Sequence, residues 1–203
     1  MSIAVRSLTG ADLDAALDAV ALLRLAVFRD WPYLYDGDLD YERRYLESYS
    51  GSAGAIVVGA FDGDRLIGAA TGTPMEDHGA EFGAAFAGSD LDLNTIFYCA
   101  ESVLLPEFRG RGLGHAFFDS REDHARALGR SHSAFCSVVR PVDHPLHPAR
   151  YRPLDDFWRK RGYAPLKGAV AEYSWKDVGE AKETAKPMQF WIRKLRGRRK
   201  EHR

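Results

Sequence analysis

A glycine-rich segment in the middle of the chain carries the clearest chemistry. Residues 101–115 read ESVLLPEFRGRGLGH, so Arg109 and Arg111 lie among three glycines, Gly110, Gly112 and Gly114. Glycine lets the backbone approach a ligand closely and adopt positive φ. Successive N–H groups at the start of a helix form an anion site. The segment therefore predicts a turn that binds a phosphate or pyrophosphate.

Two common nucleotide motifs do not fit this turn. The P-loop string, Gly-x-x-x-x-Gly-Lys-Ser/Thr, does not occur in the chain. The dinucleotide fingerprint Gly-x-Gly-x-x-Gly would need glycine at His115 or Phe117. The pattern that remains is Arg109-x-x-Gly112-x-Gly114.

Glu101 is the candidate general base. It lies in an otherwise apolar stretch directly before the turn, where a carboxylate is costly unless it is exposed, hydrogen-bonded or functional. It could take a proton from a substrate directly or through water. An exposed or hydrogen-bonded structural glutamate is an equal alternative. Tyr98, in the same stretch, is a weaker candidate and is better explained as core.

The other reactive side chains favour structural roles. A metal site at Asp143, His144 and His147 is disfavoured, because prolines interrupt that loop and no cysteine is near. We expect no metal. Cys99 and Cys136 are better explained as buried thiols than as nucleophiles. Aromatic residues between 31 and 45 indicate packing, with the wall of a substrate site as the alternative.

The elements that position these residues follow from periodicity. Alternating or apolar runs predict strands, amphipathic spacing predicts helices, and Asp-Gly at 62–63 predicts a hairpin. Residues 74–94 look like a loop. The order is β-α-α-β-β-β-α-β-α-β-β, an α/β fold with one mixed sheet flanked by helices. We expect strands at 3–6, 55–61, 65–73, 94–105, 132–139, 169–175 and 188–192, and helices from 9 to about 31 and at 39–49, 112–128 and 154–161.

Composition sets the class of protein. The 203 residues include 45% hydrophobic and 28% charged residues, which is ordinary for a globular chain and excludes general disorder. Two cysteines build no disulfide framework, and no signal peptide or membrane-spanning run appears. We therefore expect a cytoplasmic protein.

Charge is distributed unevenly along the chain. The net charge is −1, yet residues 193–203 carry +6, which leaves −7 for residues 1–192. The range 66–108 contains no Lys or Arg and seven acids. Acids that line a site would attract a cationic ligand. The basic tail indicates a solvated end rather than a nucleic-acid contact.

The chemistry-bearing strings resemble a known family. Arg109-x-x-Gly112-x-Gly114 resembles the Arg/Gln-x-x-Gly-x-Gly/Ala signature of the GNAT family of N-acetyltransferases. Residues 104–110, LLPEFRG, resemble its Val-x-Pro-Glu-Tyr-Arg-Gly, and residues 157–163, FWRKRGY, resemble its Phe-Tyr-x-Lys-x-Gly-Phe. The element order agrees over residues 3–192. The resemblance implies the GNAT, or acyl-CoA N-acyltransferase, fold as one domain over 1–192, followed by the tail.

The resemblance also implies a donor and its contacts. Acetyl-CoA would be the co-substrate, and an amine, from a small molecule or a peptide, would attack the thioester directly. The pantetheine arm would lie where the strand at 98–105 splays from the strand at 132–139. By position, the cofactor contacts are Ser102, Val103 and Leu104 for pantetheine, and Arg109, Gly110, Arg111, Gly112, Leu113, Gly114 and His115 around the pyrophosphate.

Two departures from the family pattern bear on the mechanism. The family often has a tyrosine that protonates the leaving thiolate, and Trp158 stands there. Tyr151, Tyr163 or water would then supply the proton, and Tyr151 is the candidate acid. The loop 140–153 is longer than usual and is expected beside the acceptor site. The alternative function is a non-catalytic acyl-CoA-binding module. A homodimer is possible.

Overall fold

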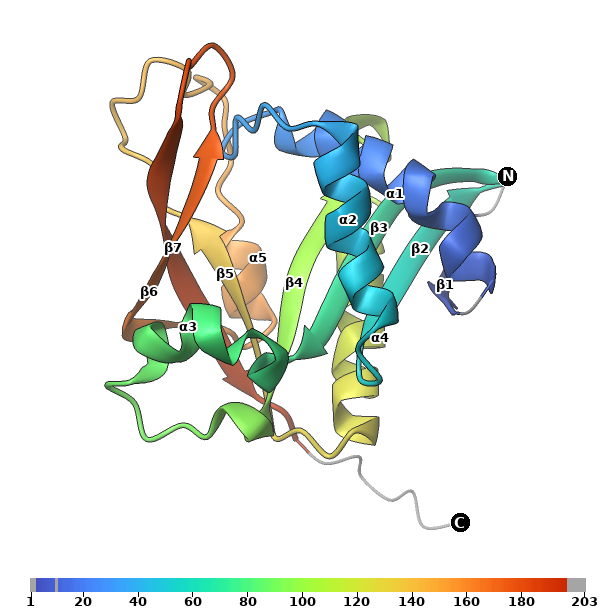
Figure 1. Cartoon of the computed structure of the whole chain (residues 1–203), viewed down its shortest axis with the longest axis vertical. Helices are drawn as coiled ribbons and strands as arrows, with labels where there is room; N and C mark the ends of the chain where they lie inside the picture. Colours follow the sequence, from blue (N-terminus) through green and yellow to red (C-terminus); the bar gives the residue numbers. More distant parts are fainter. Residues whose placement is uncertain (1–2, 10, 197–203) are drawn as a thin grey trace.

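Seven strands form one mixed sheet in the order β1-β2-β3-β4-β5-β7-β6 (Figure 1). The computed structural model describes residues 3–9 and 11–196. All neighbouring strands are antiparallel except β4 and β5, which are parallel. The strands are β1 (Ile3–Leu8), β2 (Ile56–Asp62), β3 (Arg65–Pro74), β4 (Ile96–Leu104), β5 (His132–Val138), β6 (Ala164–Lys176) and β7 (Glu183–Lys194).

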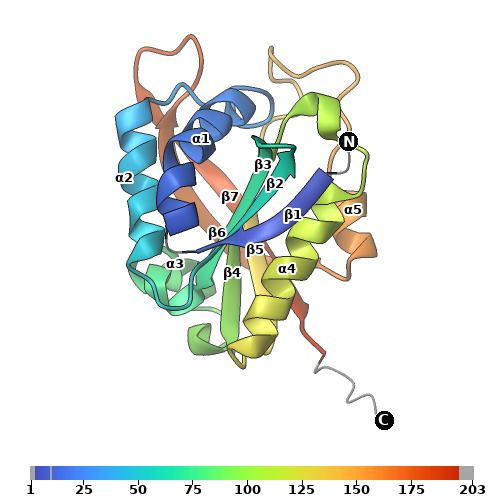
Figure 2. The same ribbon diagram turned by 90° about the vertical axis from the view of Figure 1, so that its right-hand side faces the viewer.

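Helices cover both faces of this sheet (Figure 2). On one face, α1 and α2 bury Val20, Leu23 and Leu46 against Ala69 and Val103 of the sheet. On the other face, α4 packs its phenylalanines against β4 and β5. The predicted fold class, a mixed sheet flanked by helices, is confirmed. The helices are α1 (Ala11–Phe28), α2 (Leu39–Ser50), α3 (Gly79–Phe86), α4 (Leu113–Ala127) and α5 (Asp155–Lys160).

The expectation of a loop over 74–94 was wrong. A 3₁₀ turn at Met75–His78 leads into α3, and a second 3₁₀ turn spans Leu93–Thr95. Glycine and alanine dominate α3, so its amphipathic signal is weak. Phe82 and Phe86 nevertheless stand one turn apart and are buried against Phe190, at ring-centroid distances of 5.1 and 4.8 Å. Tertiary packing therefore stabilises this helix.

The folded part of the chain extends further toward the C-terminus than residue 192, after which the sequence placed the start of a basic tail. β6 and β7 are longer than expected, and β7 continues through Lys194. Leu195 is buried and Arg193 pairs with Glu122 of α4. Residues 193–196 thus belong to the folded part. The rest of the expected basic tail, 197–203, lies outside the described residues.

The parallel strands β4 and β5 separate soon after they meet. They pair only over Ile96–Tyr98 with His132–Ala134, and both strands then run on without pairing to each other. Figure 1 shows them diverging from the end where they pair. Opposite the same point, the register between β3 and β4 shifts after Tyr98. A bulge of this kind bends a strand, which explains why β4 turns away from β5 there.

Candidate active site

The glycine-rich turn follows β4 directly and starts α4. A short 3₁₀ turn, Pro106–Phe108, leads out of the strand, and α4 begins at Leu113. Gly110 has φ 76° and Gly112 has φ 81°, a region that favours glycine. A Cβ placed on either of them would meet no atom within 4 Å. The predicted strand–turn–helix geometry is therefore present, with the glycine backbone open to a ligand.

The two arginines of the turn hold its backbone in place. Arg109 Nε donates to the carbonyl of Leu104 at 3.3 Å, and Arg111 Nη2 donates to the carbonyl of Glu107 at 3.0 Å. Both arginines and the flanking glycines are exposed. Their charge thus stays beside the first turn of α4, whose dipole also favours an anion.

The remaining predicted cofactor residues divide between core and surface. Val103 is fully buried and Leu113 is almost so, which means that only their backbone can reach a ligand. Leu104 is half-buried. The Ser102 hydroxyl accepts a hydrogen bond from Arg121 Nη2 at 2.8 Å. His115 Nδ1 lies 3.1 Å from Arg161 Nη1. All of them lie on β4, on the turn or at the start of α4.

Arg121 of α4 supplies hydrogen bonds where the β3–β4 ladder is interrupted. The residue is 1% exposed, and its Nη1 donates to the carbonyls of Thr71 at 3.1 Å and Glu101 at 2.8 Å. Buried carbonyls without partners would be costly. Sequence inspection did not single out Arg121. It joins α4 to both strands beside the predicted pantetheine path.

Glu101 does not stand alone in its strand. Its carboxylate pairs with Arg24 of α1 and accepts a hydrogen bond from Tyr45 of α2 at 3.1 Å. Its side chain is only 9% exposed. The carboxylate is therefore hydrogen-bonded and ion-paired, as the structural alternative required, and it belongs to a buried polar group reaching from α1 and α2 to β4.

Tyr33 lies near both candidate catalytic residues. Burial raises the pKa of Tyr33 strongly, and the neighbouring Cys136, Glu101 and Tyr151 raise it further. Tyr151 in turn contacts Trp31, with ring centroids 6.0 Å apart. Burial and the charge of Asp155 raise the pKa of Tyr151. Glu101 and Tyr151, far apart in the sequence, thus come to the same side of the sheet around Tyr33.

The loop 140–153 closes against the segment between α1 and α2. The rings of His144 and His147 lie 5.1 and 4.9 Å from Trp31. Arg140 donates to the carbonyls of Pro32 at 2.8 Å and Tyr33 at 2.6 Å. These histidines thus take part in ring contacts. Across residues 3–9 and 11–196, no group of three or more His, Cys, Asp or Glu side chains is arranged to hold a metal.

The two cysteines are buried free thiols. Burial raises the pKa of Cys99, and it raises the pKa of Cys136 to about 12. Cys136 lies 3.3 Å from the Tyr98 hydroxyl. Because the thiolate is the nucleophilic form, both thiols are unreactive near neutral pH. Tyr98 is 6% exposed and packs against Phe82, as expected of a core residue.

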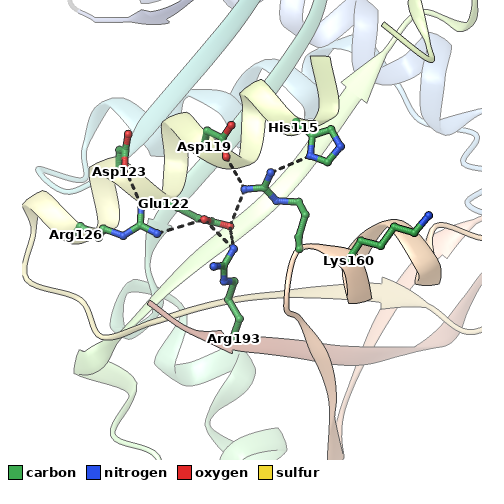
Figure 3. A pocket seen from close by; sticks show the side chains of 8 residues that line it. His115, Asp119, Glu122, Asp123, Arg126, Lys160 and Arg193 are labelled. Atoms are coloured by element: carbon green, nitrogen blue, oxygen red, sulfur yellow. Dashed lines mark hydrogen bonds and ion pairs between the residues drawn. The ribbon is translucent and has the colours of Figure 1, made fainter. Parts of the chain in front are cut away.

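A hollow of about 450 Å³ is lined by α4, the end of α5 and β7 (Figure 3). Its centre is Glu122, which is 2% exposed and pairs with Arg126, Arg161 and Arg193. Figure 3 shows Arg126 of α4 and Arg193 of β7 reaching toward the Glu122 carboxylate. Arg161, directly after α5, pairs with the same carboxylate at 3.2 Å. The cluster joins those elements, and His115 is its nearest link to the glycine-rich turn.

Trp158, at the position where the family often has tyrosine, packs into an aromatic group. Its ring lies 4.9 Å from Phe135 and 5.1 Å from Trp191. Tyr163, another possible acid, is 2% exposed and donates to Glu122 at 3.0 Å on the α4 side. Of the two tyrosines weighed as acids, Tyr151 is therefore the one on the Glu101 side.

Sequence inspection also missed Arg24 and Glu42 as functional candidates. Arg24 occupies the apolar stripe of α1 and is 7% exposed, while Glu42 on α2 is fully buried. A charge inside an apolar stripe is the signal that could have found Arg24.

Known structures share this architecture at low identity. An acetyltransferase from Salmonella typhimurium, described as putative and solved with its cofactor acetyl-CoA, is 14% identical with TM-score 0.59, covering 100% of this chain and 99% of its own. A ribosomal-protein-alanine N-acetyltransferase from Brucella melitensis is 14% identical with TM-score 0.62, covering 95% and 99%. An aminoglycoside 6'-N-acetyltransferase from Enterococcus faecium is 14% identical with TM-score 0.61, covering 98% and 99%.

The search among curated proteins found no matching relative. In the part of the chain that the structure describes, no helix has the length and hydropathy needed to cross a membrane. The family comparison is positive: the model of the acetyltransferase (GNAT) family matches residues 23–149, which include β4, the glycine-rich turn and α4. The chain belongs to the GNAT family of acetyltransferases.

Proposed function

We propose that this protein transfers the acetyl group of acetyl-CoA to a primary amine by direct attack of the amine on the thioester. The observation that carries the proposal is the glycine-rich turn, whose backbone is open to a ligand. The turn lies between β4, which diverges from β5, and the N-terminus of α4. The backbone of Gly110–Gly114 would hold the pyrophosphate. The pantetheine would follow residues 102–104 between the diverging strands.

The acceptor we propose is cationic. Several acids in the range 66–108 already have partners, as Glu76 has Arg130 and Asp92 has Asn94. Glu101 differs, because it is buried beside Tyr33 and shares its one arginine with a second carboxylate. A buried excess of negative charge attracts an ammonium group. The relatives named for aminoglycosides and for a ribosomal protein acetylate amines, which is consistent with this class.

The reaction needs one proton acceptor and one proton donor. The ammonium group of the acceptor first gives a proton to Glu101, directly or through one water. The neutral amine nitrogen then bonds to the acetyl carbonyl carbon and releases its second proton to solvent. The carbon–sulfur bond breaks, and the coenzyme A thiolate takes a proton from Tyr151 or water. Tyr151 suits this role because its raised pKa keeps the phenol protonated at neutral pH. The products are an amide and coenzyme A.

The alternative is an acyl-CoA-binding module without catalysis. It is favoured by the packing of Trp158 between aromatic rings, because the usual acid position offers no hydroxyl. Two free buried cysteines suit a reducing compartment such as the cytoplasm, and this placement fits both the acetyltransferase and the binding module.

Thiol release from acetyl-CoA, measured across amines of different charge, tests the proposal. We expect release with primary alkylamines and polyamines, and higher kcat/KM for cationic than for anionic acceptors. Mass spectrometry should find one added acetyl group on the acceptor. Tight acetyl-CoA binding with no release for any amine would contradict the enzyme and favour the binding module. A preference for anionic acceptors would contradict the electrostatic argument.

A further inference from the structure

One buried arginine serves two carboxylates next to the proposed proton acceptor. Arg24 of α1 pairs through Nε with Glu42 of α2 and through Nη1 with Glu101 of β4. The side chains of the three residues are 8%, 0% and 9% exposed, respectively. Although burial opposes its charge, the neighbouring Glu101, Tyr45 and Glu42 raise the pKa of Arg24. A fully charged guanidinium therefore lies between two carboxylates from different elements.

The surroundings fix this group in one geometry. Two aromatic rings flank the Arg24 guanidinium, at 4.3 Å for Tyr45 and 5.1 Å for Phe28. Tyr45 donates to Glu101 and lies 2.9 Å from the Tyr49 hydroxyl, which accepts from Thr71 at 3.2 Å. The titratable or charged groups around the carboxylates of Glu101 and Glu42 are Arg24 from α1, Tyr33 and Tyr35 from the α1–α2 segment, Tyr45 and Tyr49 from α2 and Cys136 from β5. Arg121 of α4 reaches the backbone carbonyl of Glu101.

Arg24 does not belong to Glu101 alone. In a one-to-one ion pair, the guanidinium would balance the whole charge of the Glu101 carboxylate. A second carboxylate on the same guanidinium opposes that effect, because like charges disfavour one another. With two acids and one base, the group keeps one net negative charge. Because Arg24 also pairs with Glu42, its positive charge balances the charge of Glu101 only in part.

We propose that Glu42 is a positioning residue for acetyl transfer: by sharing Arg24 it keeps Glu101 oriented by an ion pair and still able to accept the ammonium proton of the acceptor. This inference rests on the proposed function and assigns a task to a residue that has no path to the substrate of its own. Glu42 is fully buried, so its influence on the reaction passes through Arg24.

Two acceptors with different proton demands test the assignment. A primary alkylamine is an ammonium ion at pH 7 and must lose a proton, whereas an alkyl hydrazide is already uncharged. Glu42→Gln keeps the shape and removes one charge. We expect kcat/KM for the alkylamine to fall about tenfold, while the value for the hydrazide changes less than about twofold. The Kd for acetyl-CoA should stay at the wild-type value.

Matched variants separate charge sharing from folding. Asp40→Asn removes an acid of the same helix whose side chain is 78% exposed, and both acceptors should react as with the wild type. Glu42→Asp keeps the charge, so the ratio of alkylamine to hydrazide kcat/KM should return toward wild type even if overall activity is lower. This variant decides the question if Glu42→Gln fails to fold.

The outcomes are distinct. Equal loss for both acceptors, or no loss for either, would overturn the role of Glu42 while leaving the proposed function intact. So would a Glu42→Asp ratio as low as that of Glu42→Gln. If the wild-type protein binds acetyl-CoA but transfers nothing to either acceptor, the proposed function itself fails.

Discussion

At the scale of single residues, burial decides which side chains can do chemistry. Cys99, Cys136, Tyr98 and Tyr163 are reactive types that the fold encloses, and burial raises the pKa of each of them. A hydroxyl or thiol held protonated in the core is a poor nucleophile. Tyr151 is the exception, because it is only partly buried and borders Trp31 on the side of Glu101.

Tyr151→Phe tests the proton donor. If Tyr151 protonates the leaving thiolate, the variant should lose about tenfold or more in kcat while its Kd for acetyl-CoA is unchanged. The donor works only when protonated, and burial and Asp155 raise its pKa above the ordinary value. Wild-type activity should therefore fall only at strongly alkaline pH, and the variant should lack this fall. Tyr41→Phe, at a site 50% exposed on α2, is the control. Wild-type kcat in Tyr151→Phe would assign the proton to water.

The glycine-rich turn could be predicted from the sequence, whereas the partners of Glu101 could not. Glycine spacing after an apolar strand was enough for residues 109–114, because positive φ is a local requirement. Nothing local marks Arg24 and Glu42 as partners of Glu101, since the three meet only after α1 and α2 pack on β4. Such long-range pairs depend on tertiary structure that periodicity does not contain.

At the scale of elements, the turn between β4 and α4 is the part of the fold that we propose binds acetyl-CoA. Helices and strands were predicted well where hydrophobic periodicity and turn residues agreed, as in the β2–β3 hairpin around Gly63 with φ 61°. α3 was missed because its glycines and alanines hide a helix that two phenylalanines stabilise. The glycine-rich turn was predicted from both its composition and its position.

Gly112→Val tests the turn, and Gly129→Val is its matched control. Both glycines have positive φ, 81° and 74°, and a Cβ on either would meet nothing within 4 Å. They stand at opposite ends of α4, so the two variants carry similar backbone strain. Only Gly112→Val puts a branched side chain where the pyrophosphate would lie. Calorimetry should find coenzyme A binding lost in Gly112→Val and retained in Gly129→Val. Equal affinity in two folded variants would place the cofactor elsewhere.

At the scale of the whole molecule, three segments meet at one buried acid. Asp177, just after β6, pairs with Arg140 of the long loop at 2.6 Å and with Lys186 of β7 at 3.1 Å. Arg140 also holds the carbonyls of Pro32 and Tyr33, between α1 and α2. The β6–β7 hairpin, the loop and the α1–α2 segment are thereby held together beside Tyr33, as their proximity in Figure 1 indicates.

Asp177→Asn should reveal this junction through stability. Burial opposes the charge of Asp177, but Arg140 and Lys186 outweigh it and lower its pKa below 3.8. A lowered folded-state pKa contributes stability above the unfolded value, and that stability is lost as pH falls through the folded value. Removing the charge leaves two cations unpaired and should cost about 3 kcal/mol at neutral pH.

Urea denaturation at several pH values measures this effect. The difference between wild type and Asp177→Asn should be full at pH 7 and shrink below pH 4. Asp36→Asn is the control, because its partners Arg29 and Lys176 are exposed and such pairs contribute about 1 kcal/mol or less. A constant difference at all pH values would show that charge is not the cause.

The proposed mechanism divides two tasks between two parts of the molecule: the glycine-rich turn binds acetyl-CoA, and Glu101 accepts a proton during acetyl transfer. Single-turnover acetyl transfer to an alkylamine, measured with acetyl-CoA affinity for wild type and Glu101→Gln, tests it directly. We predict that the variant binds acetyl-CoA like the wild type and transfers the acetyl group about 10²–10⁴ times more slowly. A transfer rate near that of the wild type at several pH values, or a loss explained wholly by weaker acetyl-CoA binding, would contradict the account.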